Sequence, residues 1–322
     1  KSKNWLMIKG ELIMSKIAFL FSGQGSQYVG MGQSFYESSE TARRLMDEAN
    51  TLLPFDLKEI CFEDSKELIN QTTYTQPAIF VVSQMALALL KEAGIKADVV
   101  AGFSLGEYSA LCTAHVFNFT EGVSLVAKRG ELMGTASNNG KMAALLGLDL
   151  QKAQAVCDEA SSKGIVELAN FNCPGQIVIG GEAQAVTYAC EIAKNHGAKR
   201  ALVLPVSGPF HTSLLKETAQ TFGQLLESKE LKEPQTPIVL NVLGDYYQTD
   251  LNLKELMVQQ MATSVKWEAS IRQMIANGVD TFIEIGPGKT LSGFVKKIDR
   301  SVKILNVEDM DSLQKTLAAL NS

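Results

Sequence analysis

The sequence predicts an α/β protein in which a large α/β domain is interrupted by a small ferredoxin-like domain. Short apolar stretches alternate with helical stretches over most of the chain, which is typical of α/β folds. Between residues 141 and 205 the predicted order changes to β-α-β-β-α-β, the ferredoxin-like pattern. We therefore expect residues 14–137 and 207–322 to form the large domain and residues 138–206 the small one.

The elements follow from the spacing of apolar residues and from the turn residues between them. In the large domain, strands are predicted at 17–21, 98–101, 237–242, 281–285 and 302–306, with helices at 77–94, 121–134 and from 311 onward. In the small domain, strands are predicted at 142–148, 165–170, 176–180 and 199–205, with helices at 150–161 and 183–196.

Composition excludes several classes of function. The chain has 322 residues, 46% of them hydrophobic, and a net charge of −5, which argues against nucleic acid or an anionic membrane surface as the main partner. No apolar run approaches the ~18 residues of a membrane span. The five scattered cysteines form no C-x-x-C pair, so we expect reduced thiols, a cytoplasmic protein and no metal site.

The first residues are not typical of a secretion signal. Asn4, Lys9 and Glu11 interrupt any apolar signal-peptide core, and Met14 leads directly into the first predicted strand. We expect Met14 to be the natural start and residues 1–13 to be upstream sequence.

A nucleophile elbow is predicted around Ser104. Residues 102–106 have the pattern Gly-x-Ser-x-Gly between a short apolar strand and a stretch rich in helix formers. In this pattern the glycines allow a strained strand-to-helix turn that presents the serine hydroxyl. Backbone N–H groups at the helix start would face whatever the serine attacks.

A second glycine-rich loop, at residues 22–27, follows the first strand. It lacks the third glycine of a dinucleotide loop and the Lys-Ser/Thr of a P-loop, so no nucleotide site is predicted. Its backbone N–H groups could still point at a developing anion.

A serine nucleophile needs a general base, and the chain has only three histidines. His115 comes eleven residues after Ser104, on what is predicted to be the same helix, hence some ~16 Å away. His196 precedes Gly197 at a predicted helix end, where a cation suits the dipole. His211 remains, in a loop between a strand and a helix, and is the predicted base.

Arg129 is a charged residue on an apolar helix face. At 100° per residue it projects into the arc formed by Leu125, Val126, Leu132 and Met133. A buried charge is costly unless it is paired. Two interpretations stay open on spacing alone: a pair with a structural carboxylate, or a bidentate clamp for a substrate carboxylate.

Taken together, these motifs resemble the malonyl-CoA:acyl carrier protein transacylases of fatty acid synthesis. The likeness runs from Met14 through nearly the whole chain. Its motifs are residues 23–27 (GQGSQ), 102–110 (GFSLGEYSA), 129–130 (RG), 170–172 (NFN), 210–211 (FH) and 286–289 (GPGK). The resemblance implies an α/β-hydrolase-like large domain with a ferredoxin-like insert.

The resemblance also implies a role for each site residue. Ser104 would carry the acyl group, and His211 would act first as base and then as acid. The backbone N–H groups of Gln24 and Leu105 would form the oxyanion hole, and Arg129 would hold the malonyl carboxylate. No acidic third member is evident in the sequence; the family instead orients the histidine with a backbone carbonyl, aligned here with Gln260. Phe210 and Met133 would line the pocket.

The implied reaction is ping-pong transfer from malonyl-CoA to the phosphopantetheine thiol of acyl carrier protein. Coenzyme A thioester is then a substrate, no cofactor is expected, and the protein is expected to be a monomer. Two departures from the family pattern stand out: Phe103 replaces the histidine of Gly-His-Ser-x-Gly, and Ser22 replaces a proline.

Two other functions stay open at this point. A serine thioesterase or esterase would need no Arg129 and would hydrolyse malonyl-CoA without an acceptor. A non-catalytic docking module of a synthase complex would form no acyl-enzyme, although the presence of both Ser104 and His211 argues against it.

Overall fold

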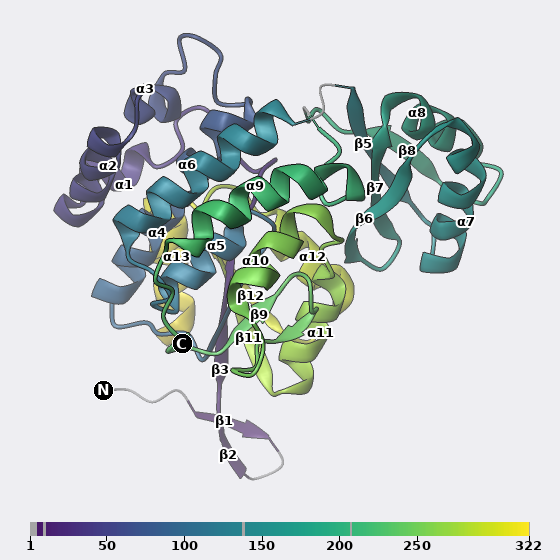
Figure 1. Ribbon diagram of the computed structural model, residues 1–322. Helices are drawn as coiled ribbons and strands as arrows, with labels where there is room; N and C mark the ends of the chain where they lie inside the picture. The colour runs from purple at the N-terminus through teal and green to yellow at the C-terminus, as the bar shows by residue number, and fades with distance from the viewer. Residues whose placement is uncertain (1–4, 9–10, 137–138, 207, 322) are drawn as a thin grey trace.

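The computed structural model describes residues 5–8, 11–136, 139–206 and 208–321, and contains two packed units (Figure 1). The larger unit is built on a six-stranded sheet and the smaller on a four-stranded sheet. The predicted domain boundaries, at residues 137–138 and 207, lie on positions outside the described residues.

The large sheet places the carboxyl ends of its parallel strands along one edge. Its order is β10-β9-β4-β3-β11-β12, parallel throughout except for the antiparallel edge strand β10. The strands are β3 (Lys16–Phe21), β4 (Val99–Gly102), β9 (Ile238–Leu240), β10 (Asp245–Tyr246), β11 (Val279–Ile285) and β12 (Lys303–Val307). In open sheets of this kind, sites form beyond the carboxyl edge.

Both faces of this sheet are covered by helices, because successive side chains of a strand point to opposite faces. Phe19 and Phe21 of β3 pack into the main apolar cluster, whereas Ala18 and Leu20 pack with Trp267 on the other face. The helices are α1 (Gln33–Ser38), α2 (Glu40–Leu52), α3 (Leu57–Phe62), α4 (Thr72–Glu92), α5 (Gly106–Thr113), α6 (Phe119–Thr135), α9 (Lys216–Glu227), α10 (Leu253–Ala262), α11 (Trp267–Ala276), α12 (Thr290–Ile298) and α13 (Met310–Asn321), with a short 3₁₀ turn at Ser213–Leu215.

Helix α4 begins five residues before its predicted start at Pro77. Proline is favoured in the first turn of a helix, which is why the sequence pattern places the start there. In the structure Pro77 lies inside the helix, and Thr72 and Gln76 are buried ahead of it. By length and composition α4 could cross a membrane, but 83% of its apolar window is buried inside the protein.

The small unit has the element order β5-α7-β6-β7-α8-β8. Its strands β5 (Gly140–Leu146), β6 (Val166–Cys173), β7 (Gln176–Glu182) and β8 (Arg200–Val203) pair antiparallel in the order β6-β7-β5-β8. Helices α7 (Leu150–Ala160) and α8 (Ala183–Ile192), with a 3₁₀ turn at Ser161–Lys163, complete it. The predicted helix to residue 196 is too long, because α8 ends at Ile192 and a turn follows up to Gly197.

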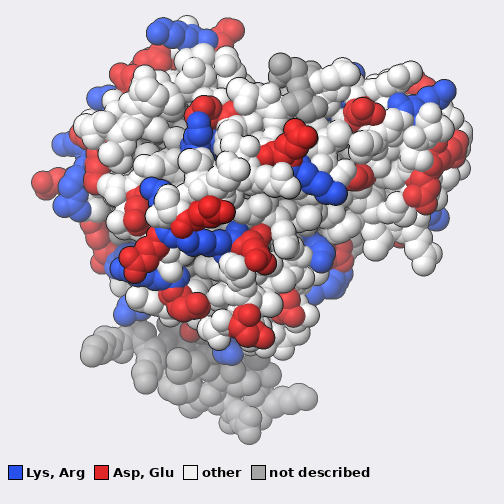
Figure 2. All heavy atoms as spheres, in the orientation of Figure 1, with Lys and Arg blue, Asp and Glu red and all other residues white. Residues whose placement is uncertain are grey.

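The stretch predicted to lie upstream of the natural start contains two strands, β1 (Trp5–Ile8) and β2 (Glu11–Met14), which pair antiparallel with each other. In Figure 1 they project below β3, away from both units. On the face shown in Figure 2, Lys and Arg are interspersed with Asp and Glu, without a large area of one sign.

Candidate active site

The turn from β4 to α5 is possible only because glycines flank Ser104. A Cβ on Gly102 would lie 1.9 Å from the backbone of Gly106, and one on Gly106 would lie 2.1 Å from the Phe21 carbonyl oxygen. Ser104 itself has φ +52°, a left-handed conformation that non-glycine residues rarely adopt. This is the strained strand-to-helix turn that the motif predicts.

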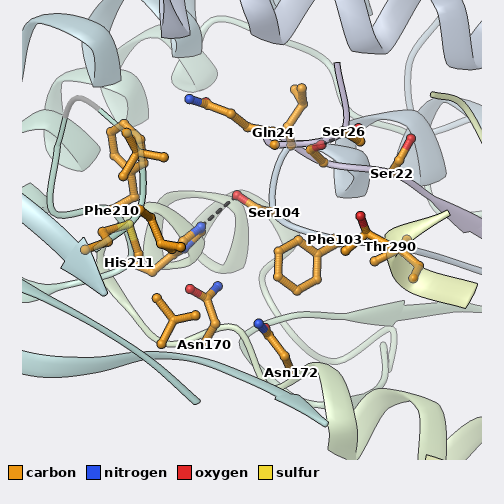
Figure 3. Close-up of a pocket in the computed structure, with 18 of the residues that line it drawn as sticks. Ser22, Gln24, Ser26, Phe103, Ser104, Asn170, Asn172, Phe210, His211 and Thr290 are labelled. Carbon is orange, nitrogen blue, oxygen red and sulfur yellow. Dashed lines mark hydrogen bonds between the residues drawn. The ribbon is translucent and has the colours of Figure 1, made fainter. Parts of the chain in front are cut away.

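Ser104 and His211 meet across the pocket, although they are 107 residues apart in sequence (Figure 3). Ser104 Oγ lies 2.7 Å from His211 Nε2, and His211 Nδ1 lies 2.7 Å from the carbonyl oxygen of Gln260. Because a carbonyl only accepts, Nδ1 carries the proton, and neutral Nε2 is left to accept the serine hydroxyl.

The protonation state of His211 suits a base. The ring is 3% exposed, and burial together with the nearby charge of Arg129 lowers its pKa to about 4. The imidazole is therefore neutral at pH 7. His211 also has a left-handed backbone, at φ +61°, so both members of the pair occupy a sparsely populated conformation of the kind that clusters at active sites.

The other two histidines lie elsewhere. His115 is exposed and follows the end of α5 at Thr113, with φ +64°, so the expectation that it shares the helix of Ser104 is wrong. The turn arises because the helix cannot continue through a left-handed residue. His196 Nε2 lies 2.8 Å from the carboxylate of Glu159. Neither histidine lines the pocket that holds Ser104.

Arg129 of α6 is fully buried and points at the nucleophile. Its Nη1 donates to Gln76 Oε1 at 2.8 Å, its Nη2 donates to Gln260 Oε1 at 2.9 Å, and Nη2 also lies 3.4 Å from Ser104 Oγ. Among the described residues, no carboxylate oxygen lies within 4.0 Å of the guanidinium. Its hydrogen-bond partners are two neutral amides and the Ser104 hydroxyl, and its charge is not cancelled by an ion pair.

Glu107, buried in α5, is an acidic residue whose electrostatic effect reaches Arg129. Burial raises its pKa to about 8, against the opposing effects of Arg129 and of a hydrogen bond from the Asn241 N–H. At neutral pH much of Glu107 is therefore protonated, which limits how far it can compensate Arg129.

Two residues of the pocket that holds Ser104 have backbone N–H groups with no acceptor in the part of the chain that the structure describes. They are Gln24, in the loop after β3, and Leu105, at the elbow. The Gln24 side chain is held by Thr72, to whose Oγ1 it donates at 3.0 Å. Two free donors next to a nucleophile are the arrangement that stabilises an oxyanion.

The pocket encloses about 210 Å³ between the two units. Ser104, His211 and Arg129 come from the large unit, and the predicted lining residues Met133 and Phe210 line the pocket. Phe103 packs edge-on against Trp267, with ring centroids 5.4 Å apart, and lies 6.1 Å from Phe294. The opposite wall comes from the small unit: Met142, Ala144, Asn170, Asn172, Gln176, Val178, Leu204 and Val206.

Several polar residues of the site escape sequence reasoning. Gln76 could have been found as a polar residue within the apolar stretch of α4, and Asn241 as a polar residue directly after a strand. The side chain of Gln260 adds contacts that its backbone role did not predict: it holds Arg129 and donates to the Ser104 carbonyl at 2.7 Å. Among the described residues, no cluster of three or more metal-ligating side chains occurs.

Comparison with known proteins identifies the family of the chain. The pattern of the acyl transferase domain matches residues 18–315. A malonyl CoA-acyl carrier protein transacylase from Bacillus subtilis is 46% identical over 310 residues, covering 95% of this chain and 98% of that protein. The chain belongs to the malonyl-CoA:acyl carrier protein transacylase family.

Solved structures of the family superpose closely. The malonyl CoA-acyl carrier protein transacylase of Clostridium perfringens has a TM-score of 0.92 and 44% identity, over 95% of this chain and 98% of that one. A malonyl-transacylase solved in complex with a type II PKS acyl-carrier protein has a TM-score of 0.91 and 36% identity, over 95% of this chain and 100% of that one. The mixed α/β fold with its parallel sheet is thus the family fold.

Proposed function

We propose that this protein moves a malonyl group from malonyl-CoA to the phosphopantetheine thiol of acyl carrier protein in fatty acid biosynthesis. The observation that carries the proposal is a fully buried, uncompensated Arg129 whose Nη2 lies 3.4 Å from the hydroxyl of a Ser–His pair. A guanidinium fork suits a carboxylate, and malonyl differs from other short acyl groups by carrying one. The names of the relatives support the same substrate and acceptor.

The first half-reaction forms an acyl-serine. Nε2 of His211 takes the Ser104 proton as Oγ attacks the thioester carbonyl, and the negative charge that develops on the carbonyl oxygen is stabilised by the N–H groups of Gln24 and Leu105. The Gln260 carbonyl stabilises the imidazolium through Nδ1–H. Collapse of the intermediate breaks the C–S bond, and His211 returns its proton to the coenzyme A thiolate.

The second half-reaction uses the same groups in the reverse sense. His211 takes the proton of the phosphopantetheine thiol, the sulfur attacks the malonyl-serine, and Ser104 Oγ leaves with the proton. Water must be kept from competing with the thiol. The enclosed pocket and its apolar small-unit wall favour a thioester arm over free water.

We also propose a fold class for each unit, the cofactor requirement, the location and the oligomeric state. We assign the large unit as α/β-hydrolase-like and the small unit as a ferredoxin-like insert, on the strength of the β-α-β-β-α-β order and its antiparallel sheet. The thioester supplies the electrophile, so the proposed reaction requires no cofactor. The five free cysteine thiols support a cytoplasmic location, and a monomer remains the predicted state.

Transfer to an acceptor tests this function against the thioesterase alternative. The protein is mixed with malonyl-CoA, with and without the phosphopantetheinylated carrier protein, and both free coenzyme A and malonyl carrier protein are measured. Without acceptor we expect release of about one coenzyme A per protein molecule, as the acyl-serine forms, and no sustained release after it. With acceptor, release should continue, with one malonyl carrier protein formed for each further coenzyme A. Sustained release without acceptor would identify a thioesterase instead.

A further inference from the structure

Asn241 connects the nucleophile turn to the neighbouring strand. It follows β9 directly, and β9 pairs with β4 through Val100↔Ile238 and Ala101↔Val239. Beyond these pairs β4 remains paired with β3 through Phe21↔Gly102, but its backbone groups on the β9 side no longer have a strand partner. The Asn241 side chain lies at this point and is 1% exposed.

The amide of Asn241 takes over the lost strand pairing. Its Nδ2 donates to the Gly102 carbonyl at 2.7 Å, and its Oδ1 accepts from the Ser104 N–H at 2.8 Å. These groups belong to the two peptide units on either side of Phe103. Because a peptide unit is planar, each bond fixes the orientation of a whole plane.

The backbone of Asn241 is itself anchored at both ends. Its N–H donates to the Glu107 carboxyl group at 2.6 Å, and its carbonyl accepts from the Lys266 N–H at 3.0 Å. A side chain held this way has little freedom to drift from the turn. The Gln260 side chain holds the next peptide unit through the Ser104 carbonyl, and the Leu105 N–H of that unit points the opposite way.

We propose that Asn241 is a positioning residue for the nucleophile: its amide holds Ser104 in the left-handed conformation that aims Oγ at His211 and directs the Leu105 N–H into the pocket. The inference rests on Ser104 being the nucleophile of the proposed function. A strained residue persists only where its surroundings over-determine it, and Asn241 supplies two of the contacts that do so.

The test compares Asn241→Leu with Val239→Ala in the full-length protein. Asn241→Leu keeps the approximate side-chain volume. It removes the amide's hydrogen bonds with Gly102 and Ser104, and also the one that Oδ1 accepts from Gln260 Nε2 at 3.3 Å. Val239 is buried on the same strand but packs into the apolar cluster on the Trp267 face, so Val239→Ala weakens the strand and leaves the amide in place. Two rates are measured at equal protein concentration: malonylation by malonyl-CoA in a rapid-quench experiment, and labelling of Ser104 by a fluorophosphonate.

We expect Asn241→Leu to lose about 10²-fold in both rates, because small misplacements of a reacting group have effects of that size. Its KM for malonyl-CoA should stay within about twofold of the parent, because Asn241 does not line the pocket. Val239→Ala should lose thermal stability and keep both rates. If Asn241→Leu fails to fold, Asn241→Asp retains the acceptor for Ser104 and should lose about tenfold, the value of one hydrogen bond.

Two results would overturn the inference: parental rates in the folded Asn241 variant, or an equal loss in Val239→Ala. The fluorophosphonate separates this failure from failure of the proposed function. If malonyl-CoA does not acylate even the parent protein, while fluorophosphonate labelling still depends on Asn241, the proposed substrate is wrong and the positioning role stands.

Discussion

The two walls of the pocket differ in chemistry. The large-unit wall holds Ser104, His211 and Arg129, each fixed by at least one hydrogen bond of 2.9 Å or less. The small-unit wall is mainly apolar, with Val178 and Met142 among its residues. One unit therefore carries the reacting groups, and the other supplies the surface that closes the pocket over them.

This difference predicts how substitutions should divide. Ser104 and His211 act on charge that develops during the reaction, so their loss should reduce kcat. Arg129 is expected to contact a charge that malonyl already carries, so its loss should change substrate preference. Apolar groups on the small-unit wall contact substrate equally before and during the reaction, so their loss should raise KM with little change in kcat.

Substituting His211 should have the largest effect. His211→Ala should lose roughly 10²–10⁴-fold in malonylation and in transfer alike, because one base serves both half-reactions. Stopped-flow or rapid-quench measurement of each half-reaction checks this. His115→Ala is the matched control and should behave like the parent. An equal loss of activity in His115→Ala would contradict the assignment of His211 as the base.

Removing Arg129 should change the preference for malonyl over acetyl groups more than the ability to transfer an acyl group. Arg129→Ala should lose malonyl transfer by about a hundredfold, the value of roughly 3 kcal/mol from two charge-assisted hydrogen bonds. Acetyl-CoA should be used as well as before or better. The readout is the ratio of malonyl to acetyl kcat/KM, with folding checked by circular dichroism.

The conservative variant sharpens that result. Arg129→Lys should not restore the parental ratio, because an ammonium cannot form the bidentate fork. An unchanged malonyl-to-acetyl ratio in Arg129→Ala would make Arg129 a structural residue and remove it from the substrate site.

Neighbouring residues of β7 test the small-unit wall. Val178 packs toward the large unit and lines the pocket, whereas Ile177 faces the small unit's own core. Val178→Ala should raise the KM for malonyl-CoA about 5- to 30-fold, by the loss of about 1–2 kcal/mol of apolar contact, with kcat nearly unchanged. Ile177→Ala should lower the melting temperature and leave KM unchanged. Equal KM values in both variants would contradict a substrate-contacting wall.

Mild acid should have the smallest effect on the rate of malonylation, because His211 stays neutral in it. With its pKa lowered to about 4, His211 stays neutral, so kcat/KM for malonylation should be level from about pH 8 to about pH 5.5. The free energy of unfolding should instead depend on pH in this range. The unfolded chain binds this proton at its usual pKa of 6.5, so the histidine destabilises the folded state as the pH falls from 6.5 toward 4. A kcat/KM profile with an inflection near 6.5 would show that the base is solvated.

Sequence reasoning predicts the parts of the site that depend on local pattern. Ser104 follows from five consecutive residues, His211 from elimination among three histidines, and Arg129 from its place on an apolar helix face. Each of these signals is contained in one element or in a simple count. The positions of most strands along the chain and the β-α-β-β-α-β succession are predictable for the same reason.

The residues that support the site are set by tertiary structure. Gln76, Asn241 and the Gln260 side chain each contact residues more than 50 positions away, apart from the Gln260–Asn241 contact. No local pattern distinguishes them from ordinary polar residues. The two-residue strand β10 is likewise too short for a periodic signal, and it exists because β9 pairs with it.

The central claim is that Ser104 on the large-unit wall carries the malonyl group. Intact mass spectrometry of the protein after brief mixing with malonyl-CoA tests it most directly, with peptide mapping to locate the group. We predict that the parent gains one malonyl group on Ser104 and that Ser104→Ala gains none. A malonyl group on another residue, or an equal gain in Ser104→Ala, would contradict the account.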